Sequence, residues 1–130
     1  MGAKEKALML HDSGFNCAQS VLGALGEYTG LDEKMALSIA SGFGGGVRCG
    51  EICGAASGAV MALGIVFPFA DGDDAAARAK NNKLTIAFTK RFSEHFGFIR
   101  CFDLKRNGIS CSDLIEYAAA LAEEMIQNNR

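Results

Sequence analysis

The sequence contains little proline and no alternating polar and apolar stretch long enough to form a useful β-strand. Pro68 is its one proline, so elsewhere no residue interrupts a helix by lacking a backbone N–H. These absences predict an all-α protein. The chain also has no internal repeat, low-complexity tract or linker, and its 130 residues are expected to form a single domain over residues 1–130.

The sequence has no excess of positive charge either. Thirteen Lys and Arg against fifteen Asp and Glu give a formal net charge of −2. Nucleic acids and anionic membranes attract basic faces, so neither is an expected partner. The apolar stretch near the N-terminus, Ala7 to Leu10, is far shorter than the apolar region of a secretion signal. We therefore expect a cytoplasmic protein.

Five cysteines are many for a cytoplasmic protein of this size. In a reducing compartment, such a number points away from structural disulfides and towards metal binding or redox chemistry. A third interpretation is that the thiols are only packed in the core, because free cysteine is often buried as a small hydrophobic residue. The position of each cysteine in the predicted helices has to separate these alternatives.

Capping residues and glycines divide the chain into about five to six helices. Residues 98–110 are expected to be a connector with a turn at Asn107-Gly108, and the segment GFGGG (42–46) to be a loop, because glycine disfavours helix. In chain order, the predicted helices are residues 3–12, one capped by Asn16 and stopped at Thr29-Gly30, one capped by Asp32 and ending near Gly42, residues 51–67, one from Asp71–Asp74 to Gly97, and one capped by Ser110.

The helix predicted over residues 51–67 belongs to an uncharged run of nineteen residues, Ile52 to Ala70. This length is close to that of a membrane span, but the run is rich in Gly, Ala and Ser and would be the only span. A central helix surrounded by the others is the simpler interpretation. Glycines at positions 50, 54 and 58 form a smooth stripe that would let another helix approach closely.

Three cysteines fall in the first turns of predicted helices. Cys17, Cys53 and Cys111 each continue the apolar face of their helix. Free N–H groups and the positive end of the helix dipole favour thiolate there, and thiolate is both the nucleophile and the metal ligand. If these helices begin at one end of the bundle, their sulfurs form one site, to which the connector brings Cys101. We expect at least three of the four sulfurs in one cluster.

The glycines of the GFGGG segment are expected to lie beside that cluster. The segment has neither the GxGxxG pattern after a strand nor the GxxxxGK[ST] pattern of a phosphate loop. It is better interpreted as a tight turn that lets backbone approach sulfur, with N–H groups of Gly44, Gly45 and Gly46 free to face the cysteines.

Other patterns carry less information. The spacings of Cys49–Cys53 and Cys101–Cys111 match no zinc-finger, thioredoxin or common ferredoxin pattern, and no C-x-x-C-H is present for covalent haem. No pair of carboxylates has a spacing that indicates general acid–base catalysis. His95 is more readily explained as a solvated or core histidine than as a ligand.

Four sequence elements carry a resemblance to a known family. They are FNCAQSVL around Cys17, GFGGGVRCGEICGAASGAVMALG around Cys53, FGFIRC around Cys101 and SCSDLIEYAAALAEEM around Cys111. Over nearly the whole chain they resemble the redox-active proteins named for the pattern C…GCAxxG…C…C. Cys53 departs from this pattern by one residue, since it follows isoleucine and precedes glycine, and Cys49 lies outside the four named positions. The resemblance implies a small helical domain whose cysteines hold an iron–sulfur cluster or cycle between thiol and disulfide.

Three functions stay open. An iron–sulfur protein for electron transfer or redox sensing would use Cys17, Cys53, Cys101 and Cys111 as ligands. An oxidoreductase that exchanges disulfides would use Cys53 with Cys49 as the resolving thiol. A structural protein would bind zinc through the same four thiolates, or only bury them. The redox partner protein is unknown, and a homo-oligomer is compatible with each function.

Overall fold

The computed structural model describes residues 1–130 and contains helices, turns and one isolated β-bridge, with no strand. The all-α prediction is confirmed, although the chain forms more helices than the five to six expected. The eight α-helices are α1 (Ala3–Asp12), α2 (Cys17–Ala24), α3 (Gly26–Thr29), α4 (Glu33–Ala40), α5 (Gly54–Val66), α6 (Ala75–Phe96), α7 (Cys101–Arg106) and α8 (Cys111–Asn129).

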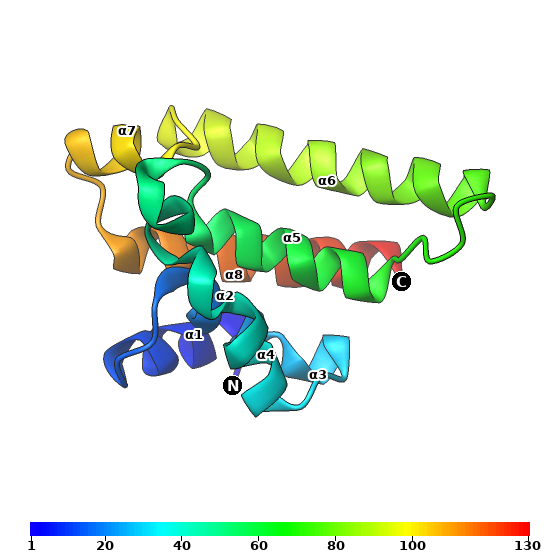
Figure 1. Ribbon diagram of the computed structural model, residues 1–130, viewed down its shortest axis with the longest axis horizontal. Coiled ribbons are helices and arrows are strands. Elements are labelled where there is room, and N and C mark those ends of the chain that lie inside the picture. Colours follow the sequence, from blue (N-terminus) through cyan, green and yellow to red (C-terminus); the bar gives the residue numbers. More distant parts are fainter.

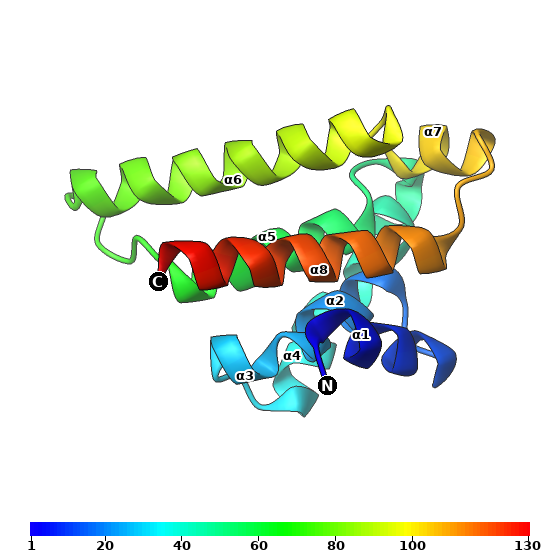
Figure 2. The same ribbon diagram turned by 180° about the vertical axis from the view of Figure 1, so that it is seen from behind.

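Helices α5, α6 and α8 run alongside one another, and the shorter helices α1 to α4 pack together on one side of them (Figure 1, Figure 2). Helix α5 contacts α2, α6 and α8 and is the central helix that the sequence predicts. A single cluster of 28 buried residues forms the core. No helix has both the length and the apolar character needed to cross a membrane.

One side of α5 is more open than predicted. Val60 and Met61 are only partly buried, and they line an apolar groove of about 400 Å³ between α5 and α6. The long helix α6 buries only three of its own side chains in the core, Leu84, Phe88 and Phe92. Because α6 touches the core through so few residues, it leaves this face of α5 partly uncovered.

The capping predictions are confirmed at the starts of three helices, and Asp74, expected only as one of the acidic residues at the start of α6, provides a fourth cap. Asn16 forms a capping box with Gln19 at α2, in which each side chain accepts a bond from the other residue's backbone N–H. The remaining three caps are Asp32 before α4, Asp74 before α6 and Ser110 before α8, each accepting a bond from the N–H three residues ahead.

Three predicted boundaries differ from the structure. The predicted second helix breaks at Leu25 into α2 and α3, between two glycines that weaken helix formation. The central helix begins at Gly54 rather than near residue 51, because residues 51–53 pair with residues 99–101. The predicted connector over residues 98–110 contains the short helix α7.

The glycine stripe is confirmed at two of its three positions. A Cβ placed on Gly58 would lie 2.7 Å from the carbonyl oxygen of Ala18 in α2, and one on Gly54 would lie 2.8 Å from the carbonyl oxygen of Phe43. Either contact would push the backbone of α5 away from the backbone segment that it touches. Gly50 lies before the helix instead, in a turn where its φ is +76°. Close packing of α2 on α5 thus requires glycine at 54 and 58.

We expect Gly58→Ala to lower the free energy of unfolding by about 1–3 kcal/mol, because its methyl group would overlap the backbone of Ala18. Gly64→Ala in the same helix is the matched control. No atom lies within 4 Å of a Cβ built there, so alanine should raise the stability by about 0.5–1 kcal/mol. Urea unfolding measures both changes, and equal stabilisation by the two substitutions would contradict the close packing.

Candidate thiol site

Four of the five cysteines lie at the starts of helices. Cys17, Cys101 and Cys111 are the first residues of α2, α7 and α8, and Cys53 directly precedes α5. Figures 1 and 2 show that α5, α7 and α8 begin at the same end of the molecule, where the chain also enters α2. The structure therefore brings together the helix starts that the sequence singled out and adds α7. All five cysteines are free thiols.

A short antiparallel pairing holds Cys53 beside Cys101. The N–H of Cys53 donates to the carbonyl oxygen of Ile99 at 2.8 Å, and the N–H of Cys101 donates to that of Glu51 at 2.6 Å. Alternate residues of an extended pair lie on the same face, so these two cysteines share one face of the pairing. Cys53 is almost fully buried, at 2% exposed.

Cys17 and Cys111 are neighbours whose thiols have the largest influence on each other's pKa. The ammonium group of Lys105 donates a hydrogen bond to the sulfur of Cys111. Cys17 is buried, at 8% exposed, whereas Cys111 is partly exposed. The pair thus consists of an accessible sulfur beside a cation and a covered sulfur behind it.

These contacts move the pKa values of the two thiols in opposite directions. The pKa of Cys111 is lowered to about 5, first by the hydrogen bond from Cys17 and then by the bond and charge of Lys105, which together outweigh its burial. The same hydrogen bond with Cys111 raises the pKa of Cys17, and burial raises it further. These opposite shifts favour the thiolate at Cys111 and the protonated thiol at Cys17.

Cys53 is coupled to the same site by charge. Burial raises the pKa of Cys53, and so do the neighbouring charges of Cys101 and Cys111. The N–H groups of Ala56 and Ala55 oppose this rise, although neither reaches the geometry of a side-chain cap bond. A buried thiol with a raised pKa is a weak nucleophile at neutral pH.

Cys49 differs from these four in being exposed. Its thiol donates to the carbonyl oxygen of Gly46 at 3.4 Å. The exchange pair of Cys53 with Cys49 stays a prediction.

The GFGGG segment forms the tight turn that its glycines predict. A Cβ on Gly44 would lie 2.6 Å from the side chain of Asn16, so this glycine packs directly against the cap that precedes Cys17. Gly45 and Gly46 are left-handed, and Val47 and Arg48 continue that conformation with φ of 57° each. A branched side chain such as valine rarely adopts it. The expected approach of the Gly44, Gly45 and Gly46 N–H groups to sulfur stays a prediction.

A metal ion requires several ligand side chains close to one point. As the side chains stand, no group of three or more His, Cys, Asp or Glu residues could hold a metal ion. A zinc site requires its sulfurs about 2.3 Å from one point. Four thiolates are the donor set of a structural zinc ion and of an iron–sulfur cluster alike.

Sequence reasoning missed Lys105 as a member of the site. It lies four residues after Cys101, one helical turn along, so a helix over residues 101–106 would have placed both on neighbouring positions of one face. The prediction of an irregular connector concealed this relation. The sequence predicts that Cys17 and Cys111 belong to one site, but nothing in it indicates that these two, on different helices, are the pair whose thiols affect each other most.

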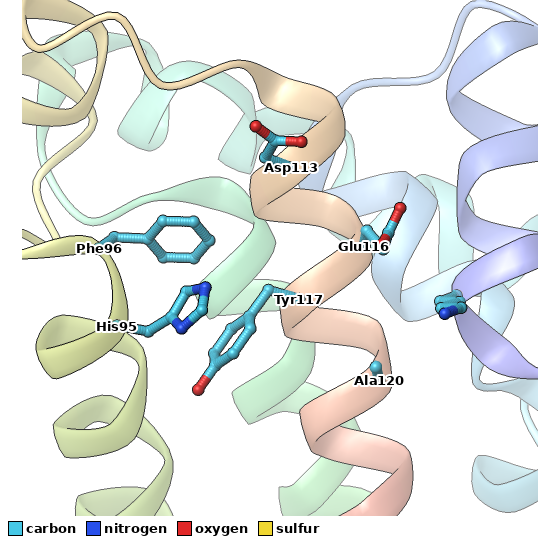
Figure 3. Close-up of a pocket in the computed structure, with 7 residues that line it drawn as sticks. His95, Phe96, Asp113, Glu116, Tyr117 and Ala120 are labelled. Carbon is cyan, nitrogen blue, oxygen red and sulfur yellow. The ribbon is translucent and has the colours of Figure 1, made fainter.

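A pocket of about 370 Å³ near α1, α6 and α8 has no cysteine in its lining. Figure 3 shows His95 of α6 facing Tyr117 of α8, and their rings stack with centroids 4.0 Å apart and planes at 13°. Phe96 packs edge-on against both rings. His95 is thus an exposed residue that joins two helices. The other lining residues are Lys4, Asp113, Glu116 and Ala120.

Comparison with known protein families gives one match, to the family described as "Putative redox-active protein (C_GCAxxG_C_C)", over residues 15–125. No curated protein and no solved structure matches the chain. The matched region contains all five cysteines, the glycine turn and Lys105. Since the match covers most of the sequence, the chain belongs to this family of redox-active proteins.

Proposed function

We propose that this protein is a thiol–disulfide redox protein whose working pair is Cys111 and Cys17. The observation that carries the proposal is the contact between a partly exposed Cys111 sulfur, held by Lys105, and the buried thiol of Cys17. Disulfide exchange needs an accessible thiolate to attack and a second thiol close enough to resolve the mixed disulfide. Membership of a redox-active family supports the same chemistry.

In the first step, the Cys111 thiolate attacks one sulfur of a disulfide substrate. The substrate's sulfur–sulfur bond breaks, one substrate thiolate leaves, and a mixed disulfide forms on Cys111. In the second step, Cys17 gives its proton to the second leaving thiolate and attacks Cys111. The bond between Cys111 and the substrate breaks, the two protein sulfurs are oxidised to a disulfide, and the same two electrons reduce the substrate to one thiol and one thiolate, which takes its proton from water.

The first step prepares the second. While Cys111 is a thiolate, its hydrogen bond and its charge both raise the pKa of Cys17. Once Cys111 carries a mixed disulfide, that negative charge is gone and the hydrogen bond to a thiolate is lost. The pKa of Cys17 then falls, and the resolving thiolate forms only after the attacking one has reacted. Lys105 acts as the group that keeps Cys111 ionised in the resting protein.

Alkylation kinetics test the state of Cys111. The rate at which iodoacetamide modifies Cys111 should follow the thiolate fraction and reach half its maximum near pH 5. Lys105→Met removes a neighbouring cation, so it should raise this midpoint and slow alkylation at about pH 4 by about tenfold for each unit of pKa. Lys90→Met, on an exposed position of α6, is the control and should leave the midpoint unchanged.

Peptide mass spectrometry at each pH measures the modification at Cys111 separately from the other thiols. A midpoint near that of a free thiol, about 8.5, in the unaltered protein would contradict the proposed resting thiolate.

Trapping the intermediate tests the roles of the two sulfurs. In Cys17→Ser, oxidation by a small disulfide should stop at a stable mixed disulfide on Cys111, because the resolving thiol is gone. Cys49→Ser should still form the internal bond between Cys17 and Cys111. Peptide mapping without reduction identifies the bonds, and a disulfide between Cys49 and Cys53 as the main product would refute the proposed pair.

A second function is favoured by the meeting of four cysteine-bearing helix starts at one end of the molecule. In that case Cys17, Cys53, Cys101 and Cys111 would hold an iron–sulfur cluster, which when bound would supply one-electron transfer. Lys105 and the helix N-termini would offset the negative charge of its thiolates.

Anaerobic reconstitution with ferrous iron and sulfide distinguishes the two functions. Cluster binding should give visible absorbance and bound sulfide that are lost in each serine variant at positions 17, 53, 101 and 111 and kept in Cys49→Ser. It should also protect Cys111 from iodoacetamide. The dithiol function predicts instead a protein that stays colourless after desalting and keeps its reactive Cys111.

A further inference from the structure

The surface next to Cys111 is formed by α7. Leu104 is fully buried and fixes this helix to the core, and Lys105 extends from it to the sulfur of Cys111. Phe102 and Arg106, one helical turn apart, remain exposed on its outer side. The helix that carries Lys105 to Cys111 thus also presents one apolar and one basic side chain to solvent.

The segment that contains α7 has a net positive charge, although the net charge of the whole protein is negative. Residues 100–106 carry three basic side chains and one acidic one, whereas the whole chain has a net charge of −2. The turn over residues 46–50, which packs against α7, adds Arg48. Neither Arg48 nor Arg106 has a carboxylate partner, and both are exposed. We call Arg48, Lys105 and Arg106 the cationic rim.

The carboxylates near the rim are already engaged elsewhere. Glu51 and Asp103 both pair with Arg100, at 3.1 and 3.6 Å. Asp113, two residues after Cys111, lines the pocket beside Phe96 (Figure 3). Glu51 and Asp103 share one guanidinium and Lys105 is bonded to the sulfur of Cys111, so these neighbours offset part of the positive charge of the rim. Arg48 and Arg106 are the members of the rim that form no ion pair.

Apolar side chains lie on the same elements as the rim. Val47, Ile52 and Phe102 are 49%, 43% and 55% exposed, high values for residues of this kind. Apolar surface lowers the local dielectric, so charges beside it attract a bound anion more strongly than isolated surface charges do.

We infer that the thiol site selects disulfides that carry carboxylate groups close to their sulfur atoms, and that Arg48 and Arg106 of the cationic rim set this preference. The inference rests on the proposed exchange between Cys111 and Cys17. A focused positive potential raises the local concentration of an anionic substrate and its rate of encounter with the Cys111 thiolate. A cationic disulfide is repelled by the same charges.

Three small disulfides of similar size and different charge test this inference: 3,3′-dithiodipropionate, 2-hydroxyethyl disulfide and cystamine. Each second-order rate of Cys17–Cys111 bond formation is divided by the rate of the same disulfide with free 2-mercaptoethanol, which removes differences in intrinsic reactivity. At low ionic strength the normalised rate for the dicarboxylate should exceed that for cystamine by about tenfold or more. Added salt should reduce this ratio.

Variants identify the residues responsible. The double substitution Arg48→Gln with Arg106→Gln should lower the ratio to about threefold or less and should leave the rate with the neutral disulfide unchanged. Lys83→Gln with Lys90→Gln, on exposed positions of α6, removes the same charge and is the control, which should retain the ratio.

The outcomes separate this inference from the proposed function. If the internal disulfide forms with all three probes at equal normalised rates, or fastest with cystamine, the inference is wrong and the exchange function stands. If the control variant lowers the ratio as much as the rim variant, the preference comes from net charge and the rim assignment is wrong. If no probe yields the Cys17–Cys111 bond, the exchange function itself is wrong, and this inference with it.

Discussion

The close approach of α2 to α5 is the constraint on which the thiol site depends. Ala18 packs against both Gly54 and Gly58, and a methyl group would overlap the carbonyl oxygen of Ala18 at Gly58 and that of Phe43 at Gly54. Ala18 directly follows Cys17, and Gly54 directly follows Cys53. The contact that seals the core therefore also fixes the positions of two cysteines, and the alanines and glycines of the central helix serve the site as well as the packing.

Burial and neighbouring charges then give chemically identical thiols different pKa values. Cys17 and Cys53 are buried by the core, which disfavours their ionised forms, whereas Cys111 lies at the edge beside Lys105 and a bond from Cys17. Charge on Cys111 and a proton on Cys17 stabilise each other. This asymmetry provides an attacking sulfur and a resolving sulfur with no histidine or carboxylate base, in agreement with a sequence that offers no acid–base constellation.

The helices and their caps could be predicted because their causes are local. Asn16, Asp32 and Ser110 bond to N–H groups three residues away, and the cysteines that directly follow Asn16 and Ser110 could be read from the same pattern. The pairing of residues 51–53 with 99–101 joins segments nearly fifty residues apart and is too short to leave an alternating pattern. This pairing shifts the start of α5 to Gly54. Its second segment runs directly into α7, the helix that carries Lys105. The missed features are the long-range ones.

Redox titration of a variant with only two cysteines tests the central claim most directly. With Cys49, Cys53 and Cys101 all replaced by serine, the remaining Cys17 and Cys111 should titrate as a two-electron couple, with about 30 mV for each tenfold change in the oxidised-to-reduced ratio. The midpoint should stay close to that of the unaltered protein. A folded variant that forms no internal disulfide at any potential, while the unaltered protein does, would contradict the account.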